Sequence, residues 1–166
     1  SAFLALAKAP CFGPWGGMRP PRYMDLALEE ARAAAARGEV PVGAVVVGPE
    51  GVVVARAGNR TRELHDPSAH AEMLAIRAAC DAAGSERLSG HDLYVTLEPC
   101  AMCAGVIAAT RLSAVYYGAP DPKSGGVAHG ARVFAHPQAH HCPEVYDGLA
   151  AEDSAALLRA FFAARR

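Results

Sequence analysis

The chain has 166 residues, a length that suits one compact domain and disfavours two. Hydrophobic residues make up 52% of it and charged residues 20%, so it can bury a core, and wholesale disorder is excluded. Lysine and arginine (16) nearly balance the acidic residues (17), and a formal charge of −1 excludes attraction of DNA or a membrane by bulk charge. No apolar run approaches the roughly 20 residues that span a bilayer, so no membrane segment is expected.

The first 22 residues differ in composition from the rest of the chain. An apolar stretch at 2–7 runs into a segment rich in glycine and proline, without the basic region and longer apolar core of a secretory signal. We therefore expect residues 1–22 to be an extension, disordered or non-native, before a single domain at 23–166.

Alternating helices and strands are predicted after this extension. Apolar residues at helical spacing, followed by glycine, predict helices at 23–37 and 69–83. Valine-rich runs on either side of a Gly-Pro-Glu-Gly turn predict a β-hairpin, formed by 42–47 and 52–57. Further elements are expected as strand, short helix, strand and long helix, at 92–97, 100–109, 114–117 and 151–165. Strands separated by helices imply crossovers, so we predict an α/β fold with three α/β/α layers, a central mixed sheet of about five strands and helices on both faces.

The cysteines suit a reduced protein better than a disulfide framework. Their number is odd and only one pair is closely spaced, which indicates a few thiolate ligands and a cytoplasmic location. The five positions are Cys11, Cys80, Cys100, Cys103 and Cys142.

Two short patterns carry the chemistry. His70-Ala71-Glu72 stands at the start of one predicted helix, and Pro99-Cys100-Ala101-Met102-Cys103 at the start of the next. Cysteines three apart share a helix face, the helix N-terminus favours thiolates, and Pro99 suits a first turn. Two thiolates and a neutral imidazole give Zn²⁺ three of its usual four ligands and leave one position for water, as in catalytic zinc sites.

Glu72 is predicted to be the catalytic acid and base. Residues two apart on a regular helix point about 200° away from each other. His70 and Glu72 therefore reach one cleft only if His70 precedes the helix, and Pro67 and Ser68 just upstream indicate a helix start there. Glu72 would then lie beside the water without binding the ion, placed to move a proton to the substrate.

The ordered pair of motifs resembles that of zinc-dependent nucleobase deaminases. From Tyr23 to Arg166 the chain is similar to the bacterial tRNA adenosine deaminases, the TadA family of the cytidine deaminase-like superfamily. The resemblance is carried by Glu39 to Val45, Gly58 to Arg60, Asp66 to Met73, Val95 to Gly105, Tyr117 to Ala119, Asp121 to Lys123 and Ala155 to Arg166.

This resemblance implies hydrolytic deamination of adenosine to inosine at the wobble position of a tRNA anticodon, with one zinc ion per chain. It implies a homodimer acting on an anticodon stem-loop, expected to be that of an arginine tRNA. Asn59 matches the family's residue that hydrogen-bonds the purine, and Asp121 with Lys123 matches a loop beside the cleft. Further RNA contacts are expected from Arg60, Phe162, Arg165 and Arg166. At least one of Phe161 and Phe162 is expected in the core.

After Lys123 the chain departs from the family. Where Gly-Ser and later Asn-His are common, it has Ala128-His129 and His140-His141, so the detailed substrate contacts of this loop are not carried over. Cys11, Cys80 and Cys142 receive no chemical role.

Two other functions fit the same motifs. A small-molecule deaminase of guanine, cytosine or a nucleoside would use the same zinc site and Glu72. A structural zinc module, completed by His141 or Cys142, would have four protein ligands and no activity. The run from Ala101 to Gly105 and the C-terminal arginines favour the tRNA enzyme.

Overall fold

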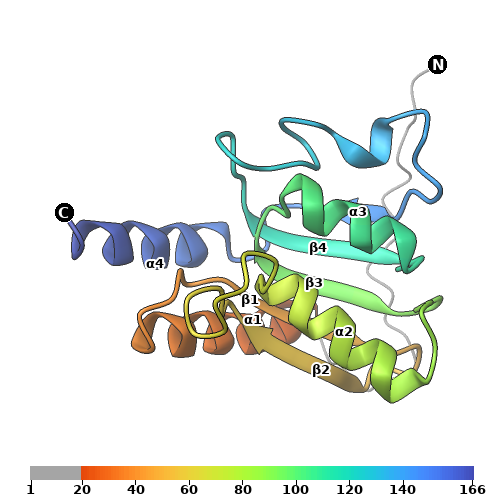
Figure 1. Ribbon diagram of the computed structural model, residues 1–166, viewed down its shortest axis with the longest axis horizontal. Coiled ribbons are helices and arrows are strands. Elements are labelled where there is room, and N and C mark those ends of the chain that lie inside the picture. The colour runs from red at the N-terminus through yellow and green to blue at the C-terminus, as the bar shows by residue number, and fades with distance from the viewer. Residues whose placement is uncertain (1–19) are drawn as a thin grey trace.

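The computed structural model describes residues 20–166, and the prediction made for residues 1–19 lies outside this part. Figure 1 shows a central sheet with helices on both of its faces. The elements run α1 (Pro20–Ala36), β1 (Gly43–Val47), β2 (Val53–Gly58), α2 (Ala71–Ala83), β3 (Asp92–Leu97), α3 (Ala101–Ala109), β4 (Ala114–Ala119), the 3₁₀ turn η1 (Val133–Ala135), β5 (Glu144–Tyr146) and α4 (Ala151–Ala163).

The sheet is mixed and five-stranded, as predicted. Its strand order is β2-β1-β3-β4-β5; β1 is antiparallel to both of its neighbours, whereas β3, β4 and β5 run parallel. The position of the fifth strand, at Glu144–Tyr146, was not predicted. Helix α1 begins at Pro20 rather than at Tyr23, so it includes the end of the segment expected to be an extension.

The alternation of side chains along each strand supplies two apolar layers. Leu93 and Val95 of β3 pack with α2 and α3 on one face, whereas Tyr94 packs with Tyr23 and Met24 of α1 on the other. The three-layer α/β/α prediction is therefore confirmed. Helix α4 packs on β4 and extends beyond the edge of the sheet (Figure 1).

A row of tyrosines crosses the face that α1 covers in part. Tyr23 lies against Tyr94, Tyr94 stacks on Tyr116, and Tyr116 stacks on Tyr146, with ring centroids 5.1, 4.4 and 4.7 Å apart. Such contacts add stability beyond the burial of ring area. They link the partly exposed edge of the sheet to its buried centre.

Gly43 allows α1 to approach the sheet closely. A Cβ atom at this position would overlap the carbonyl oxygen of Ala27 and lie 2.6 Å from the Ala31 nitrogen. Glycine is therefore required where β1 passes under α1. Along residues 20–166, none of the helices combines the length and apolar character needed to cross a bilayer.

Candidate active site

His70 is held just outside helix α2. Its backbone angles, φ −68° and ψ 155°, are extended, and the regular helix begins at Ala71. This is the arrangement that the sequence required, because it lets His70 and Glu72 face one cleft. Glu72 lies in the first turn and is only 4% exposed.

Cys100 has the corresponding position before helix α3. It is the N-cap residue, with φ −71° and ψ 173°, and Cys103 lies buried in the first turn. The sequence analysis expected Pro99 in the first turn of the helix. In the structure, Pro99 instead precedes the N-cap residue. Its carbonyl oxygen accepts a hydrogen bond of 2.8 Å from the Gly126 nitrogen, which ties the following loop to the site.

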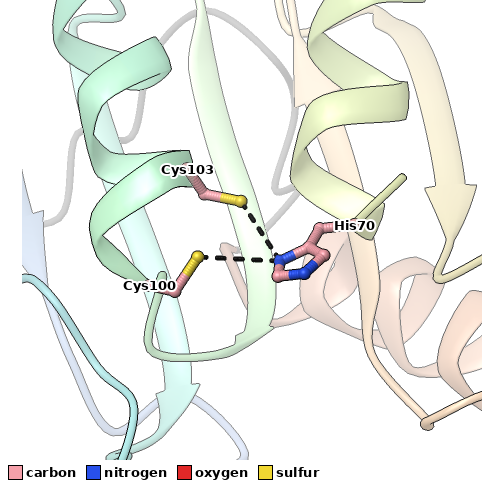
Figure 2. A group of neighbouring side chains, drawn as sticks. All are labelled: His70, Cys100 and Cys103. Atoms are coloured by element: carbon pink, nitrogen blue, oxygen red, sulfur yellow. Dashed lines mark hydrogen bonds between the residues drawn. The ribbon is translucent and has the colours of Figure 1, made fainter. Parts of the chain in front are cut away.

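The two helix starts bring three metal-binding groups together, as Figure 2 shows. His70 Nδ1 lies 3.6 Å from the Cys100 sulfur and 3.5 Å from the Cys103 sulfur. A tetrahedral zinc ion with ordinary bond lengths separates nitrogen and sulfur ligands by about 3.5 Å. The three groups therefore fit Zn²⁺ in both donor type and spacing.

Among residues 20–166, this is the one group of three or more metal-binding side chains with ligand atoms within 4.8 Å of one another. His141 and Cys142 do not belong to it, and His141 Nε2 instead lies 2.7 Å from the Leu112 carbonyl oxygen. The described cysteines are all free thiols. A closed site with four protein ligands therefore lacks its fourth ligand here, which opposes the structural zinc module.

The charges of the site also favour a bound cation. The hydrogen bond from Cys103 and the neighbouring His70 lower the pKa of Cys100 to about 4. The same hydrogen bond, together with burial, raises the pKa of Cys103. A second thiolate beside the first is thus unfavourable without a positive ion, and a dication removes this penalty.

Glu72 lies beside this group without joining it. Burial raises the pKa of its carboxyl, and an interaction with the Cys103 thiol partly opposes that effect. Glu72, His70 and Cys100 line one pocket of about 230 Å³. The carboxyl group therefore borders the space in which a substrate atom and a water molecule could meet.

Two residues predicted to bind the substrate line the same pocket. Asn59 is buried and Asp121 is half-buried. Asp121 Oδ1 accepts hydrogen bonds from the backbone nitrogens of Lys123 and Ser124. Lys123 itself is exposed and does not line the pocket, although Ser124, which follows it, does.

The expected RNA contacts lie outside the pocket. Arg60 forms an ion pair of 2.8 Å with Glu63, and Arg165 lies 3.4 Å above the Phe161 ring. Phe161 is buried in the core, as expected for one of the two phenylalanines, whereas Phe162 is 49% exposed. Arg166 is exposed at the end of the chain.

Glu98 also lines the pocket, and its place there was not predicted from sequence. Its fully enclosed carboxylate accepts hydrogen bonds from the backbone nitrogens of Asp121, Val127, Ala128 and His129, at 3.1 to 3.3 Å, and lies 2.7 Å from His129 Nδ1. Burial would raise its pKa, but these hydrogen bonds outweigh burial and lower it.

Glu98 therefore holds the loop at 121–129 over one side of the pocket. The available signal was a carboxylate placed directly after a buried strand and before Pro99. Its partners, however, lie more than 20 residues further along the chain, and no local pattern indicates them. His129, a departure from the family, takes part in this attachment.

Comparisons with known proteins agree with this geometry. The family described as the cytidine and deoxycytidylate deaminase zinc-binding region matches residues 19–119. A tRNA-specific adenosine deaminase of Agrobacterium fabrum is 58% identical over 144 residues, which are 87% of this chain and 94% of the relative.

Solved structures show the same likeness. One, from a study of A-to-I editing by tRNA:A34 deaminases at the wobble position of transfer RNA, has a TM-score of 0.81 and 58% identity, covering 82% of this chain and 99% of that one. A guanine deaminase from Nitrosomonas europaea has a TM-score of 0.75 at 24% identity, covering 87% and 85% of the two chains, and shares the fold.

The mixed sheet and the His70, Cys100 and Cys103 group define a zinc-dependent deaminase, and thus a hydrolytic enzyme. Within this class, the 58% identity to a curated relative over most of both chains shows the family. The chain belongs to the tRNA-specific adenosine deaminase family.

Proposed function

We propose that this chain deaminates adenosine to inosine at the wobble position of a tRNA anticodon, in the cytoplasm. The observation that carries the proposal is the buried Glu72 carboxyl beside the His70, Cys100 and Cys103 group, in a pocket of about 230 Å³. That volume lies below the range typical of drug-sized ligands and suits one base turned out of its stack. The 58% identity to a tRNA-specific relative supports tRNA over a free base.

The chemistry divides between the ion and the chain. Zinc held by His70, Cys100 and Cys103 would lower the pKa of water and so supply a nucleophile near neutral pH. Glu72 would accept a proton from the water and pass it to adenine N1 while oxygen adds to C6. It would then help to protonate the amine that leaves as ammonia, so water and adenosine give inosine and ammonia.

The remaining pocket residues would hold the base and the RNA. Asn59 would hydrogen-bond the purine, and Asp121 would shape the opposite side of the pocket. Outside the pocket, phosphates or unstacked bases would be contacted by Arg60, Lys123, Phe162, Arg165 and Arg166. Such a short list of cations agrees with the formal charge of −1, because one base in a small loop is recognised by a shaped pocket rather than by a broad positive surface.

An anticodon loop is a physically reasonable source of the base. Turning a base out of a loop costs less free energy than breaking a pair in a duplex. We further propose that the substrate is an arginine tRNA and that the enzyme acts as a homodimer, as the family resemblance implies. In a dimer, the second chain could line the cleft and add to its cations.

One set of reactions tests the proposal. The zinc-loaded protein is incubated separately with an arginine-tRNA anticodon stem-loop, guanine, cytosine and adenosine, and both ammonia and the product base are measured. We expect inosine in the stem-loop alone. Activity confined to a free base or nucleoside would overturn the tRNA assignment and favour the small-molecule deaminase.

A further inference from the structure

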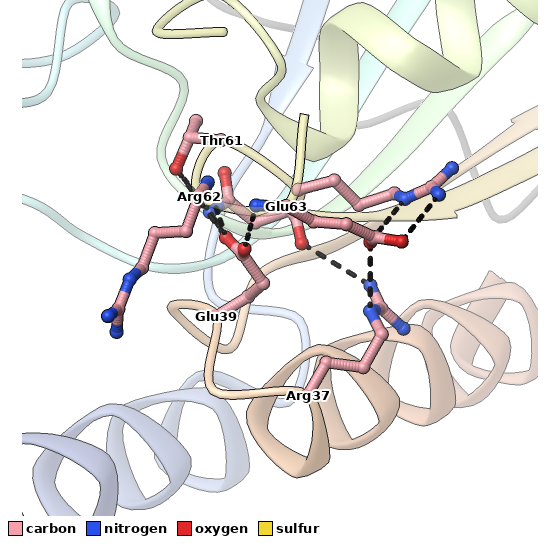
Figure 3. Close-up of polar contacts among 7 residues, drawn as sticks. Arg37, Glu39, Thr61, Arg62 and Glu63 are labelled. Atoms are coloured by element: carbon pink, nitrogen blue, oxygen red, sulfur yellow. Dashed lines mark hydrogen bonds and ion pairs between the residues drawn. The ribbon is translucent and has the colours of Figure 1, made fainter. Parts of the chain in front are cut away.

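Glu39 is a buried carboxylate that no step of the proposed reaction uses. It follows helix α1 and is only 2% exposed. Its Oε2 accepts a hydrogen bond of 3.1 Å from Asn59 Nδ2 and one of 3.3 Å from the Arg62 nitrogen, and its Oε1 accepts one of 2.8 Å from the Glu63 nitrogen. Figure 3 shows the carboxylate facing the turn at Thr61 to Glu63. The buried charge is thus matched by donors from one short loop.

The chemistry of a carboxylate fixes which way the Asn59 amide faces. An ionised carboxylate only accepts hydrogen bonds, so the amide nitrogen, and not its oxygen, must face Glu39. The same nitrogen lies 3.3 Å from Thr61 Oγ1, which can accept its second hydrogen. Within the described residues, Asn59 Oδ1 accepts no hydrogen bond, and it is not among the enclosed polar atoms without a partner. The oxygen is therefore the amide atom left for a partner in the pocket.

Other residues hold the backbone of Asn59 independently. Its nitrogen donates a hydrogen bond of 3.0 Å to the Val42 carbonyl oxygen, and its own carbonyl oxygen accepts one of 3.3 Å from Arg37 Nη2. The backbone therefore keeps its place without Glu39. What Glu39 controls is the orientation of the Asn59 side chain, together with the course of the next turn at 61–63.

We propose that Glu39 is a positioning residue that acts through Asn59. By holding the amide nitrogen, it keeps Oδ1 turned toward the substrate and so sets the hydrogen-bonding pattern that the pocket offers to a purine. The inference rests on the proposed function in one respect, that Asn59 contacts the base. It goes beyond that function because Glu39, which does not line the pocket, would help to determine which base is bound.

A double-mutant cycle of Glu39→Gln and Asn59→Ala tests the inference. Glutamine has nearly the same shape, but it can both donate and accept, so it tolerates either orientation of the Asn59 amide. We expect Glu39→Gln to lower kcat/KM for the stem-loop by about 10- to 100-fold while one zinc ion per chain is retained. In an Asn59→Ala background the same change should cost nothing further.

Two more variants serve as a charge control and as a replacement in case Glu39→Gln does not fold. Glu50→Gln removes one negative charge at an exposed turn and should leave kcat/KM and the melting temperature unchanged. Thr61→Val removes the second acceptor of the Asn59 amide, together with the long hydrogen bond of 3.5 Å that Thr61 Oγ1 donates to Glu39, and keeps the Glu39 carboxylate itself. If Glu39→Gln does not fold, the cycle is made with Thr61→Val, for which we expect a loss of about threefold to tenfold that also vanishes without Asn59.

A second readout does not depend on activity. The side-chain amide signals of Asn59, assigned by their absence from Asn59→Ala in proton–nitrogen NMR spectra, should exchange slowly with solvent in the wild type and quickly in Glu39→Gln. Additive losses in the cycle, or unchanged amide exchange, would overturn the inference. An inactive wild type would instead overturn the proposed function, and the amide exchange would still decide the role of Glu39.

Discussion

Glu72 lies at the start of α2, buried and next to the His70, Cys100 and Cys103 group, where the proposed reaction requires a proton carrier. Replacing it with glutamine preserves shape but removes the group that accepts and returns the proton. We expect Glu72→Gln to fold and to bind one zinc ion per chain, while kcat falls by about 10²- to 10⁴-fold. Zinc analysis and an inosine assay on the stem-loop measure both. The matched control is Glu86→Gln, at an exposed position; near wild-type turnover in Glu72→Gln would remove Glu72 from the mechanism.

Asp92 is a charged residue that weakens the fold at neutral pH. Burial, together with the nearby Glu144 carboxylate, raises its pKa to about 6. The folded chain thus keeps a proton that the unfolded chain releases near its ordinary pKa of about 3.9, so stability falls as pH rises between these values.

Asp92→Asn should therefore stabilise the protein. We expect the free energy of unfolding to rise by about 2 kcal/mol near pH 7.5 and by less near pH 5. Urea unfolding of the zinc-loaded wild type and variant at both pH values measures the difference. A gain that is equal at the two values would show that the charge of Asp92 is not its cause.

The three residues of the candidate zinc site could be chosen from sequence, whereas the carboxylates that hold the loops around the pocket could not. His70, Cys100 and Cys103 lie in two short motifs whose donor types already suit zinc. Glu39 and Glu98 bind loops that lie 20 or more residues away, and only the fold brings these segments together. A carboxylate that holds a loop looks the same in sequence as one that faces solvent.

The packing of α1 on β1 depends on Gly43. A methyl group there would overlap the backbone of α1 at Ala27, and backbone atoms cannot rotate away as a flexible side chain can. We expect Gly43→Ala to lower the free energy of unfolding by about 2 to 4 kcal/mol. Chemical denaturation of the zinc-loaded protein measures the change.

Gly105 offers the matching control within helix α3. Nothing lies within 4 Å of a Cβ atom placed there, and the position is exposed. Gly105→Ala should therefore raise stability by about 0.5 to 1 kcal/mol. If Gly43→Ala and Gly105→Ala changed the free energy of unfolding by similar amounts, the close approach of α1 would not explain why position 43 requires glycine.

Most helices and strands were predictable, because each has an apolar period of its own. The strand at 92–97 matches its prediction, and α2 begins only two residues late, at Ala71. β5 lacked such a signal: Glu144 to Tyr146 is three residues long and largely exposed, and it is a strand because it pairs with β4. In the segment between β4 and β5, the part at 121–129 is likewise held by Glu98, which lies more than 20 residues earlier in the chain.

For the whole molecule, affinity for RNA should depend on few charges. We expect the double variant Arg165→Ala, Arg166→Ala to raise KM for the stem-loop and leave kcat nearly unchanged, because these residues lie outside the pocket. The slope of log affinity against log salt concentration should fall by about one to two. Binding titrations at several salt concentrations measure it.

Arg87→Ala is the control for this experiment. Arg87 is exposed and follows the C-terminal end of α2, away from the helix start that carries His70. It should change neither KM nor the salt slope. An equal loss for both variants would indicate general attraction of RNA to positive charge rather than contacts made by the residues that follow α4.

The attachment of the loop by Glu98 has a consequence for how this enzyme can evolve. Four of the groups bound by its carboxylate are peptide nitrogens, and every amino acid except proline supplies one. The side chain at Ala128 can therefore change without releasing the loop, because only its peptide nitrogen is bound, while His70, Cys100 and Cys103 stay in place. Proline at Val127, Ala128 or His129 is the change that this attachment excludes, because it would remove one of the bound N–H groups.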